Sequence, residues 1–218
     1  VKKNIISSYG IDSNKICVIY NGIELKEVDY KSSFQRLYQE FPIKESTPIL
    51  LFVGSGYKRK GVYEFLQIFA ALENKEIIAF IVGKEKNTEY YKALSKELNI
   101  ETRVIFTGAR TDVDDFYAVS DIFLFPTHYE PFGNVILEAM NMKNVIFTTS
   151  QCGGSELLDI DFIMEDPADF SVVNKINKLL GNQKKLKAIQ EINRIKSKQF
   201  SIEKNLELTL DIIKEVMD

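Results

Sequence analysis

Two carboxylates separated by seven residues are the side chains of this sequence best suited to binding or catalysis. Glu130 precedes Pro131 and, because the residue before a proline avoids the helical region, Glu130 is expected in a loop. Glu138 falls in the helix that follows, about one and a half turns, or roughly 8 Å, beyond the helix start. Since carboxylate oxygens accept charge-assisted hydrogen bonds from hydroxyl groups, these two side chains could bind hydroxyls at the two ends of one ligand.

A cluster of cations follows an apolar run earlier in the chain. Residues 54–61 read GSGYKRKG and are expected to lead directly into a helix. Gly54 and Gly56 would let the backbone approach a ligand closely, and the helix start supplies unpaired N–H groups. Arg59 and Lys60 stand where a helix dipole disfavours positive charge, so an anion is expected beside them. The spacing fits neither a Walker loop nor a dinucleotide fingerprint; it predicts a diphosphate site, with a solvated basic turn as the alternative.

Polar residues around the second helix have more ordinary expectations. Gly133 and Asn134 are expected to open this helix and to offer backbone N–H groups to an anion or a sugar hydroxyl. His128, the only histidine, is expected to be a solvent-facing loop residue. Asp112 and Asp114 stand at the start of another helix, where capping is a better explanation than metal binding.

Short apolar runs alternate with helical patterns along most of the chain. Runs typical of strands buried on both faces lie at residues 49–53, 77–82, 104–107, 122–125 and 145–148. Helical spacing is found at residues 61–73, 88–98, 111–120 and 134–142, residues 15–20 are a further strand candidate, and residues 168–217 predict two or three amphipathic helices. This order predicts an α/β fold with a Rossmann-like, doubly wound parallel sheet and helices on both faces, whose ligands bind beyond the carboxyl ends of the strands.

Size and composition fit one globular domain. The 218 residues, 45% apolar and 27% charged, suffice for a single core, and a net charge of −3 gives no sign of nucleic-acid binding. No transmembrane run and no secretory signal is present, so a cytoplasmic protein with two buried, reduced cysteines, Cys17 and Cys152, is expected. Residues 1–4 look like the middle of a helix, which predicts that the chain is part of a longer protein.

Several motifs in register resemble the signature of one enzyme family. The E-x7-E spacing from Glu130 to Glu138 resembles that of the retaining GT-B glycosyltransferases of family 4. Five further segments resemble other motifs of this family and occur in the same order: residues 18–23 (VIYNGI), 54–61, 104–108 (VIFTG), 118–126 (AVSDIFLFP) and 152–156 (CGGSE). The GSxxxRKG form of the loop resembles lipopolysaccharide-core glucosyltransferases. The resemblance implies one half of a GT-B fold, a single nucleotide-sugar-binding domain over residues 1–218.

The resemblance also implies roles for the matching residues. Lys60 would bind the donor's diphosphate, assisted by Arg59, because Ser55 stands where many members carry an arginine. Glu130 would contact the transferred hexose and Glu138 the ribose. The residues implied around the sugar and phosphates are Gly54, Ser55, Gly56, Phe132, Gly133 and Asn134, and those implied around the base are Arg110 and Val113.

The activity that the resemblance implies is transfer of a hexose, with retention of anomeric configuration and without a metal, from a UDP-sugar such as UDP-glucose to a glycan or lipid-linked acceptor. The implied partner is an N-terminal acceptor domain absent from this chain, to which residues 201–218 would cross back, so the isolated domain is expected to be inactive. A non-catalytic nucleotide-sugar-binding subunit and a nucleotide-sugar epimerase of the same fold are the alternatives. The basic residues 184–187 are expected to be a solvated helix face, with a peripheral contact at the inner face of the membrane as the alternative.

Overall fold

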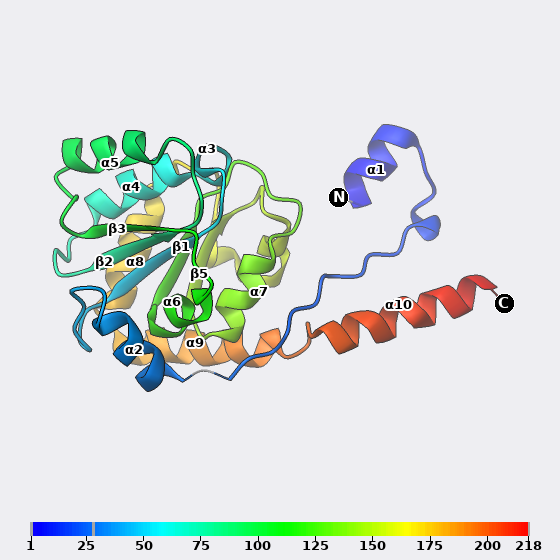
Figure 1. Ribbon diagram of the computed structural model, residues 1–218. Helices are drawn as coiled ribbons and strands as arrows, with labels where there is room; N and C mark the ends of the chain where they lie inside the picture. The colour runs from blue at the N-terminus through cyan, green and yellow to red at the C-terminus, as the bar shows by residue number, and fades with distance from the viewer. Residues whose placement is uncertain (1, 28, 218) are drawn as a thin grey trace.

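The computed structural model describes residues 2–27 and 29–217 and confirms the predicted α/β fold (Figure 1). Six parallel strands form one sheet in the order β3-β2-β1-β4-β5-β6. The chain first builds β1, β2 and β3 outward to one edge and then crosses back, so that β4 pairs with the other side of β1. This reversal of strand order is the switch point of a doubly wound sheet.

The strands and helices alternate along the chain much as predicted. The strands are β1 (Ile49–Val53), β2 (Ile78–Val82), β3 (Val104–Gly108), β4 (Ile122–Phe125), β5 (Val145–Thr149) and β6 (Ile163–Met164). The helices are α1 (Lys2–Tyr9), α2 (Tyr30–Tyr38), α3 (Tyr57–Lys60), α4 (Val62–Ala71), α5 (Thr88–Glu97), α6 (Val113–Val119), α7 (Asn134–Asn141), α8 (Ser171–Leu180), α9 (Gln183–Ser197) and α10 (Ile202–Met217). Short 3-10 turns lie at Ser13–Lys15, Gly153–Leu157 and Ile160–Phe162.

Helices cover both faces of the sheet, which explains the continuous apolar strands. Leu51 of β1 pairs with Phe80 of β2, and because neighbouring residues of a strand point to opposite faces, Phe52 points away from Phe80. Phe52 packs against Phe65 of α4 with the ring centres 5.9 Å apart, and Phe80 packs against Phe116 of α6 at 5.1 Å. Helices α4 and α6 therefore lie on opposite faces, and every residue from 49 to 52 is buried.

The prediction of a strand at residues 15–20 is wrong. After the turn at Ser13–Lys15, this segment runs as an irregular arm, and Val18 is 51% exposed. The arm first pairs with another segment at Ile23, which forms a parallel bridge with Ser201. Its β-branched residues favour an extended backbone, but in the described structure the arm has no neighbouring strand along residues 16–20 with which to form a ladder.

Other differences are smaller. The sequence pattern does not predict α2, whose two large buried side chains, Phe34 and Leu37, are set in a polar segment, or the two-residue strand β6. Helices α4 and α6 begin later than predicted because Gly61 and Asp112 take non-helical N-cap conformations. Cys152 is buried, whereas Cys17 is exposed, so the expectation of two buried thiols is wrong for Cys17.

Both ends of the chain project from the body as helices (Figure 1). Helix α1 occupies the region where the sequence looked helical, and α10 occupies most of the predicted segment 201–218; Val1 and Asp218 lie outside the described residues. Neither helix buries any residue. Within residues 2–27 and 29–217, no helix is long and apolar enough to cross a membrane.

Candidate functional site

The two predicted binding loops meet at the switch point of the sheet. Residues 54–61 follow β1, residues 126–133 follow β4, and these strands are neighbours in the sheet although β2 and β3 lie between them in the chain. The loops touch each other, because the backbone N–H of His128 donates a 3.0 Å hydrogen bond to the carbonyl oxygen of Arg59. Doubly wound sheets bind their ligands at this place.

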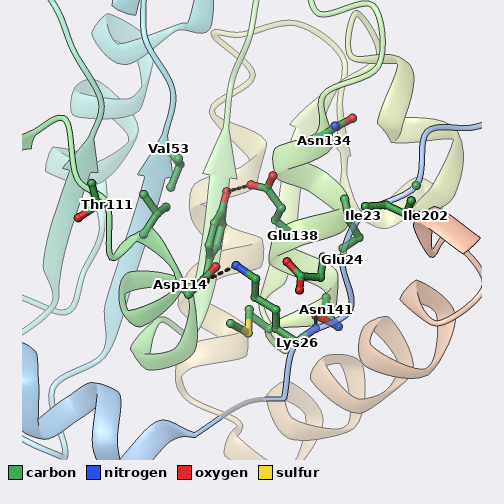
Figure 2. A pocket seen from close by; sticks show the side chains of 14 residues that line it. Ile23, Glu24, Lys26, Val53, Thr111, Asp114, Asn134, Glu138, Asn141 and Ile202 are labelled. Carbon is green, nitrogen blue, oxygen red and sulfur yellow. Dashed lines mark hydrogen bonds and ion pairs between the residues drawn. The ribbon is translucent and has the colours of Figure 1, made fainter.

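A cavity of about 490 Å³ opens beside these strand ends (Figure 2). Its lining includes Val53 at the end of β1, Val113 and Tyr117 of α6, and Asn134 and Glu138 of α7. The volume lies within the range of sites for small organic ligands. Three residues predicted to bind a donor, Val113, Asn134 and Glu138, therefore line one cavity.

Glu138 presents a half-buried carboxylate to this cavity. The hydroxyl of Tyr117 donates a 3.0 Å hydrogen bond to Glu138 Oε2. Burial raises the pKa of Glu138, and the hydrogen bond from Tyr117 opposes that rise. Below this pair in Figure 2, Lys26 Nζ forms a 2.5 Å ion pair with Asp114 Oδ2. The cavity thus combines a carboxylate acceptor with a separate charged pair.

Glu130 lies between the two predicted phosphate-binding cations. Its Oε2 forms an ion pair with Lys60 Nζ and lies 3.5 Å from Arg59 Nη1. Arg59 Nη1 also donates to the carbonyl oxygen of Tyr129 at 2.7 Å. The Lys60 side chain is 12% exposed and the Arg59 side chain 53% exposed. An anion entering here would therefore meet Arg59 first and compete with Glu130 for Lys60.

The surroundings of Lys60 act on its charge in opposite directions. Burial, together with repulsion from Arg59, lowers the pKa of Lys60 to about 8. Its ammonium group lies 5.0 Å from the centre of the Phe125 ring and pairs with Glu130, and both contacts favour the charged form. Lys60 is therefore a cation at neutral pH whose charge is lost more readily than that of an ordinary lysine.

Two glycines bring these loops together. Gly61 has φ +79°, and a Cβ at this position would collide with the carbonyl oxygen of Pro126. Gly133, the N-cap of α7, has φ +85°, and a Cβ there would lie 2.9 Å from Cγ of Glu130. The missing side chain of Gly133 therefore lets Glu130 lie directly against the start of α7, where backbone N–H groups lack helical partners.

The loop after β1 differs in detail from the prediction. Its cations do not open a long helix; they form the one-turn helix α3, which Gly56 precedes with φ +76° and Gly61 ends. Helix α4 starts afresh at Val62. Ser55 Oγ accepts a 3.2 Å hydrogen bond from the backbone N–H of Lys84, which helps to fix this loop, and a Cβ at Gly54 would lie 3.8 Å from Cγ of Lys60.

The N-terminal arm covers the start of α7. Asn21 Nδ2 donates a 2.8 Å hydrogen bond to Asn134 Oδ1, and the ring of Tyr20 lies 5.7 Å from that of Phe132. Tyr20 also donates a 2.7 Å hydrogen bond to Glu156 Oε2. Phe132 and Asn134 are thus held by the arm. The motif VIYNGI contains Tyr20 and Asn21, but its sequence does not show that these side chains reach the site.

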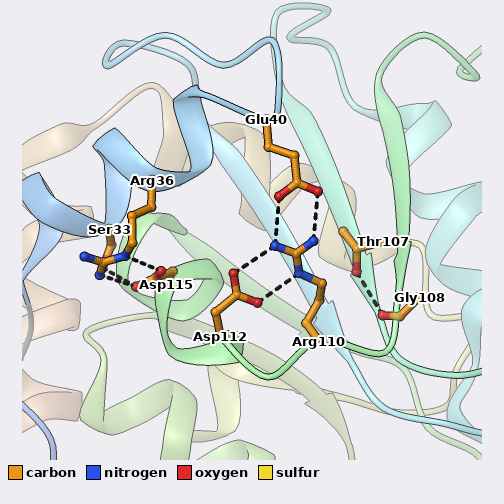
Figure 3. Close-up of polar contacts among 8 residues, drawn as sticks. All are labelled: Ser33, Arg36, Glu40, Thr107, Gly108, Arg110, Asp112 and Asp115. Atoms are coloured by element: carbon orange, nitrogen blue, oxygen red, sulfur yellow. Dashed lines mark hydrogen bonds and ion pairs between the residues drawn. The ribbon is translucent and has the colours of Figure 1, made fainter.

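Figure 3 shows Arg110 between the carboxylates of Glu40 and Asp112, two residues that are not among the described residues lining the cavity. Its guanidinium donates to both carboxylate oxygens of Glu40 at 2.8 Å and to those of Asp112 at 2.9 and 2.8 Å. It also lies 5.4 Å from the centre of the Phe116 ring. Because these two carboxylates occupy its fork, Arg110 joins the segment after α2 to the start of α6 and is not among the described cavity-lining residues, unlike Val113.

Three residues near the cavity escape the sequence analysis. Tyr117 looks like one of several apolar core positions of its helix, and Lys26 lies in a polar segment with no motif. The expectation that Asp112 and Asp114 cap this helix is wrong. Asp114 forms an ion pair with Lys26. Asp112 occupies the N-cap position, but its side chain pairs with Arg110 and accepts no capping hydrogen bond.

His128 lies at the surface in the loop after β4. The His128 side chain is 49% exposed, which confirms a solvent-facing histidine, and its Nε2 lies 3.0 Å from Glu64 Oε1. In the part of the chain that the structure describes, no three His, Cys, Asp or Glu side chains are grouped so that they could hold a metal ion.

Known proteins resemble this chain in both sequence and fold. The family model described as "Glycosyl transferases group 1" matches residues 33–196. Lipopolysaccharide glucosyltransferase WaaG of Escherichia coli (strain K12) is 35% identical over 118 residues, which cover 53% of this chain and 31% of WaaG. A crystal structure of WaaG aligns with 97% of this chain and 60% of its own, at a TM-score of 0.82 and 26% identity. HepE of Anabaena in complex with UDP-glucose aligns at a TM-score of 0.84 and 22% identity, over 98% of this chain and 61% of its own, which is a likeness of fold.

The family match contains both binding loops and both acids, Glu130 and Glu138. This chain spans less than two thirds of the length of the relatives just described. The structural neighbours agree with the predicted half of a GT-B fold. The chain therefore belongs to the glycosyl transferases group 1 family.

Proposed function

We propose that this chain binds a nucleoside diphosphate sugar, with a UDP-hexose as the preferred donor, and that it is the donor half of a retaining glycosyltransferase. The observation that carries the proposal is the placement of two acids at one helix: Glu130 lies between Lys60 and the start of α7, and Glu138 lies further along α7 in the cavity. The family match supports glycosyl transfer, and the UDP-glucose complex of HepE supports the donor class.

In this proposal the ion pair of Lys60 with Glu130 marks the place of the ligand. The donor's diphosphate takes the positive charge of Lys60 and Arg59, and Glu130 then accepts hydrogen bonds from hydroxyls of the hexose. Glu138, held in place by Tyr117, accepts hydrogen bonds from the ribose hydroxyls. Val113 and its neighbours in the cavity lie around the base. In this arrangement the acid before α7 and the acid within α7 hold the two ends of one nucleotide sugar.

Transfer breaks the bond between the anomeric carbon and the phosphate oxygen. A hydroxyl oxygen of the acceptor bonds to the same face of that carbon, and its proton leaves to the released phosphate or to solvent. The departing diphosphate gains negative charge, which Lys60, Arg59 and the first N–H groups of α7 stabilise. We propose that the chain does this without a metal ion.

The acceptor and the location of the protein belong to the same proposal. The name of WaaG supports a glycan acceptor of the lipopolysaccharide type, and a lipid-linked glycan is the related possibility. The acceptor site would be completed by an N-terminal domain of the same protein, in the cytoplasm or at the inner face of the membrane, and the isolated chain would bind donor but transfer nothing.

Calorimetric titration with UDP, UDP-glucose, GDP and ADP, with and without EDTA, tests the donor site. Binding of one diphosphate nucleotide that survives EDTA and is lost in Lys60→Ala supports the proposal. Failure of every nucleotide to bind the full-length protein contradicts it. Binding without any transfer by the full-length protein would instead indicate a non-catalytic nucleotide-sugar-binding subunit.

A further inference from the structure

A second cavity, of about 600 Å³, lies beside α3, α4 and α5, which Figure 1 shows close together. The loop between β2 and α5 and the loop after β4 complete its lining. Its lining includes Lys58, Tyr63, Glu64, Asn87, Tyr90 and His128. The roles proposed above for the donor site leave all six without a function.

Two partly exposed tyrosine rings line this cavity. Tyr63 is 39% exposed and Tyr90 is 50% exposed. Tyr90 packs edge-on against Tyr91 with ring centres 5.1 Å apart, and Tyr91 packs in the same way against the buried Tyr57 at 5.3 Å. The ring of Tyr90 is therefore supported from the core, which reduces the entropy it would lose on binding a ligand. Such rings offer an apolar face together with a polar edge.

Glu64 provides a hydrogen-bond acceptor at the same cavity. Its side chain is 15% exposed, and its Oε1 lies 3.0 Å from His128 Nε2. Its other oxygen, Oε2, is buried, and no donor within the described residues reaches it. Oε2 is closed off from solvent, so a ligand hydroxyl would meet this side chain at its accessible part, where the carboxylate could accept a further hydrogen bond.

The charges around the cavity do not favour an anion. Glu85, which also lines it, already accepts backbone hydrogen bonds from Tyr57 and Asn87, at 2.8 and 3.1 Å. Lys58 is the lining residue with a full positive charge, and it is exposed. Two carboxylates against one ammonium contrast with the pair of cations beside Glu130. Aromatic faces, an acceptor and few cations suit a neutral ligand that is rich in hydroxyl groups.

We propose that this cavity is a saccharide subsite, which holds a sugar unit of the acceptor glycan beside the donor site. The apolar C–H face of a pyranose would lie on Tyr90 or Tyr63, and its hydroxyls would donate to Glu64 and accept from Asn87 or Lys58. Two short segments join the cavity to the donor site. Lys58 lines the cavity while Arg59 and Lys60 contact Glu130, and His128 lies two residues before Glu130. The inference rests on the proposed function, because that function makes the neighbouring sugar an acceptor.

Amide chemical-shift mapping of the isotope-labelled full chain tests the subsite. The chain is first saturated with UDP and then titrated with methyl α-D-glucoside and, separately, methyl α-D-galactoside. UDP is expected to shift amides around Lys60, Val113 and Glu138. A glycoside is expected to shift a separate set around Glu64, Tyr90 and His128. Tyr90→Ala and Glu64→Gln should each weaken glycoside binding by about tenfold and leave UDP affinity unchanged. Tyr38→Ala, which removes a 60% exposed tyrosine from α2, is the matched control and should change neither.

The two proposals fail in different ways. If UDP produces no shifts, the donor site of the chain as proposed for UDP fails, whatever the glycosides do. If UDP binds but neither glycoside shifts the second set, or if Tyr90→Ala and Glu64→Gln leave glycoside affinity as it was, the saccharide subsite is overturned. Two variants are used because Glu64→Gln keeps the volume of the side chain, so its effect cannot come from an empty space.

Discussion

The hydroxyl of Tyr117 in α6 donates a 3.0 Å hydrogen bond to the carboxylate of Glu138 in α7. Tyr117 is fully buried in α6, the helix that precedes β4 in the chain, and Glu138 lines the cavity from α7, the helix that follows β4. The hydrogen bond therefore connects these two helices. It fixes the direction of the carboxylate and favours its charged form. Tyr117 is thus a positioning residue for Glu138.

Replacing Tyr117 with Phe should weaken UDP binding by about tenfold, because a hydrogen bond to a charged group contributes on the order of 1.5 kcal/mol. Burial already raises the pKa of Glu138, and loss of the bond should raise it further. The carboxylate binds hydroxyls best when ionised, so UDP affinity falls as pH falls through this pKa, and in Tyr117→Phe the fall should begin at a higher pH. Calorimetry across pH measures both effects.

Tyr57→Phe is the control for this variant. Tyr57 is also fully buried, and its hydroxyl donates a 2.9 Å hydrogen bond to the carbonyl oxygen of Gly83, outside the lining of the cavity. It should cost similar stability, lower UDP affinity less than Tyr117→Phe does, and leave the pH profile of UDP binding unchanged. Equal loss of affinity in the two variants would mean that Tyr117 acts only through general stability.

Lys60→Ala should reduce UDP affinity by about 1.5–3 kcal/mol, or roughly 10- to 150-fold, because it removes the inner, largely buried cation. Arg59→Ala should cost less, because its side chain is 53% exposed and solvent screens its charge. Lys58→Ala, one position before Arg59 and outside the Glu130 cluster, should have little effect on UDP. Titration calorimetry of the three variants gives the order, and a loss in Lys58→Ala as large as that in Lys60→Ala would contradict the assignment.

The pKa of Lys60 adds a pH test to the same site. The ammonium form attracts the diphosphate and the neutral amine does not, so the contribution of Lys60 to UDP affinity is complete at pH values below its pKa of about 8 and is lost as pH rises through it. Bound phosphate favours the charged amine, which shifts the loss to higher pH in the complex. The wild-type chain should therefore lose UDP affinity between neutral pH and about pH 10, more steeply than Lys60→Ala. Parallel profiles for the two proteins would show that another group titrates.

Some of this site follows from the sequence because its signals are local. Pro131 and Gly133 place Glu130 before the helix, helical spacing places Glu138 within it, and continuous apolar runs give the buried strands. Lys60 and Glu130 follow two parallel strands, and the carboxyl ends of parallel strands meet at the same end of the sheet, so their proximity could also be predicted. These features need only the chain's own periodicity and turn residues.

The parts that could not be predicted depend on a distant partner. Arg110 follows a strand like a ligand-binding residue, but Glu40 from a segment seventy residues earlier occupies its guanidinium. Residues 15–20 have the composition of a strand and find no neighbouring strand in the described structure. Tyr117 has the apolar spacing of a core residue, and its polar edge has a role only once α7 is in place. Contacts between segments so far apart leave no pattern in a single sequence.

Asp121→Asn should stabilise the fold near neutral pH. The carboxylate accepts a 2.9 Å hydrogen bond from the backbone N–H of Ile49 at the start of β1, and burial raises its pKa from 3.8 to about 6. The native state therefore keeps a proton that the unfolded chain releases, so stability declines as pH rises from about 4 to 6 and is level above. The full shift corresponds to roughly 2–3 kcal/mol.

Asparagine keeps an oxygen acceptor for Ile49 and carries no charge. Asp121→Asn should gain about 1–2 kcal/mol at neutral pH, less than the full shift because its amide N–H groups must find partners. Denaturant unfolding at several pH values measures this, and the decline between pH 4 and 6 should become shallower in the variant. An unchanged slope would assign the decline to other carboxylates.

Gly61→Ala and Gly56→Ala separate the close approach of the two loops from backbone strain alone. Both glycines hold left-handed φ angles, +79° and +76°, so an added Cβ costs on the order of 1 kcal/mol in each. At Gly56 nothing lies within 4 Å of the added atom, whereas at Gly61 it meets the backbone carbonyl of Pro126, which cannot rotate away as a side chain can. Gly61→Ala must push the α3 turn off the loop after β4 and break the hydrogen bond from His128 to Arg59.

Gly61→Ala should therefore cost at least about 2 kcal/mol more than Gly56→Ala in chemical unfolding, within the range of overpacking substitutions. It should also weaken UDP binding, because Lys60 and Glu130 come from the two loops that separate. Gly56→Ala should cost only the backbone strain, since its added Cβ meets no neighbouring protein atom. Similar losses of stability in the two variants would show that backbone strain, and not contact between the loops, decides how the two loops lie.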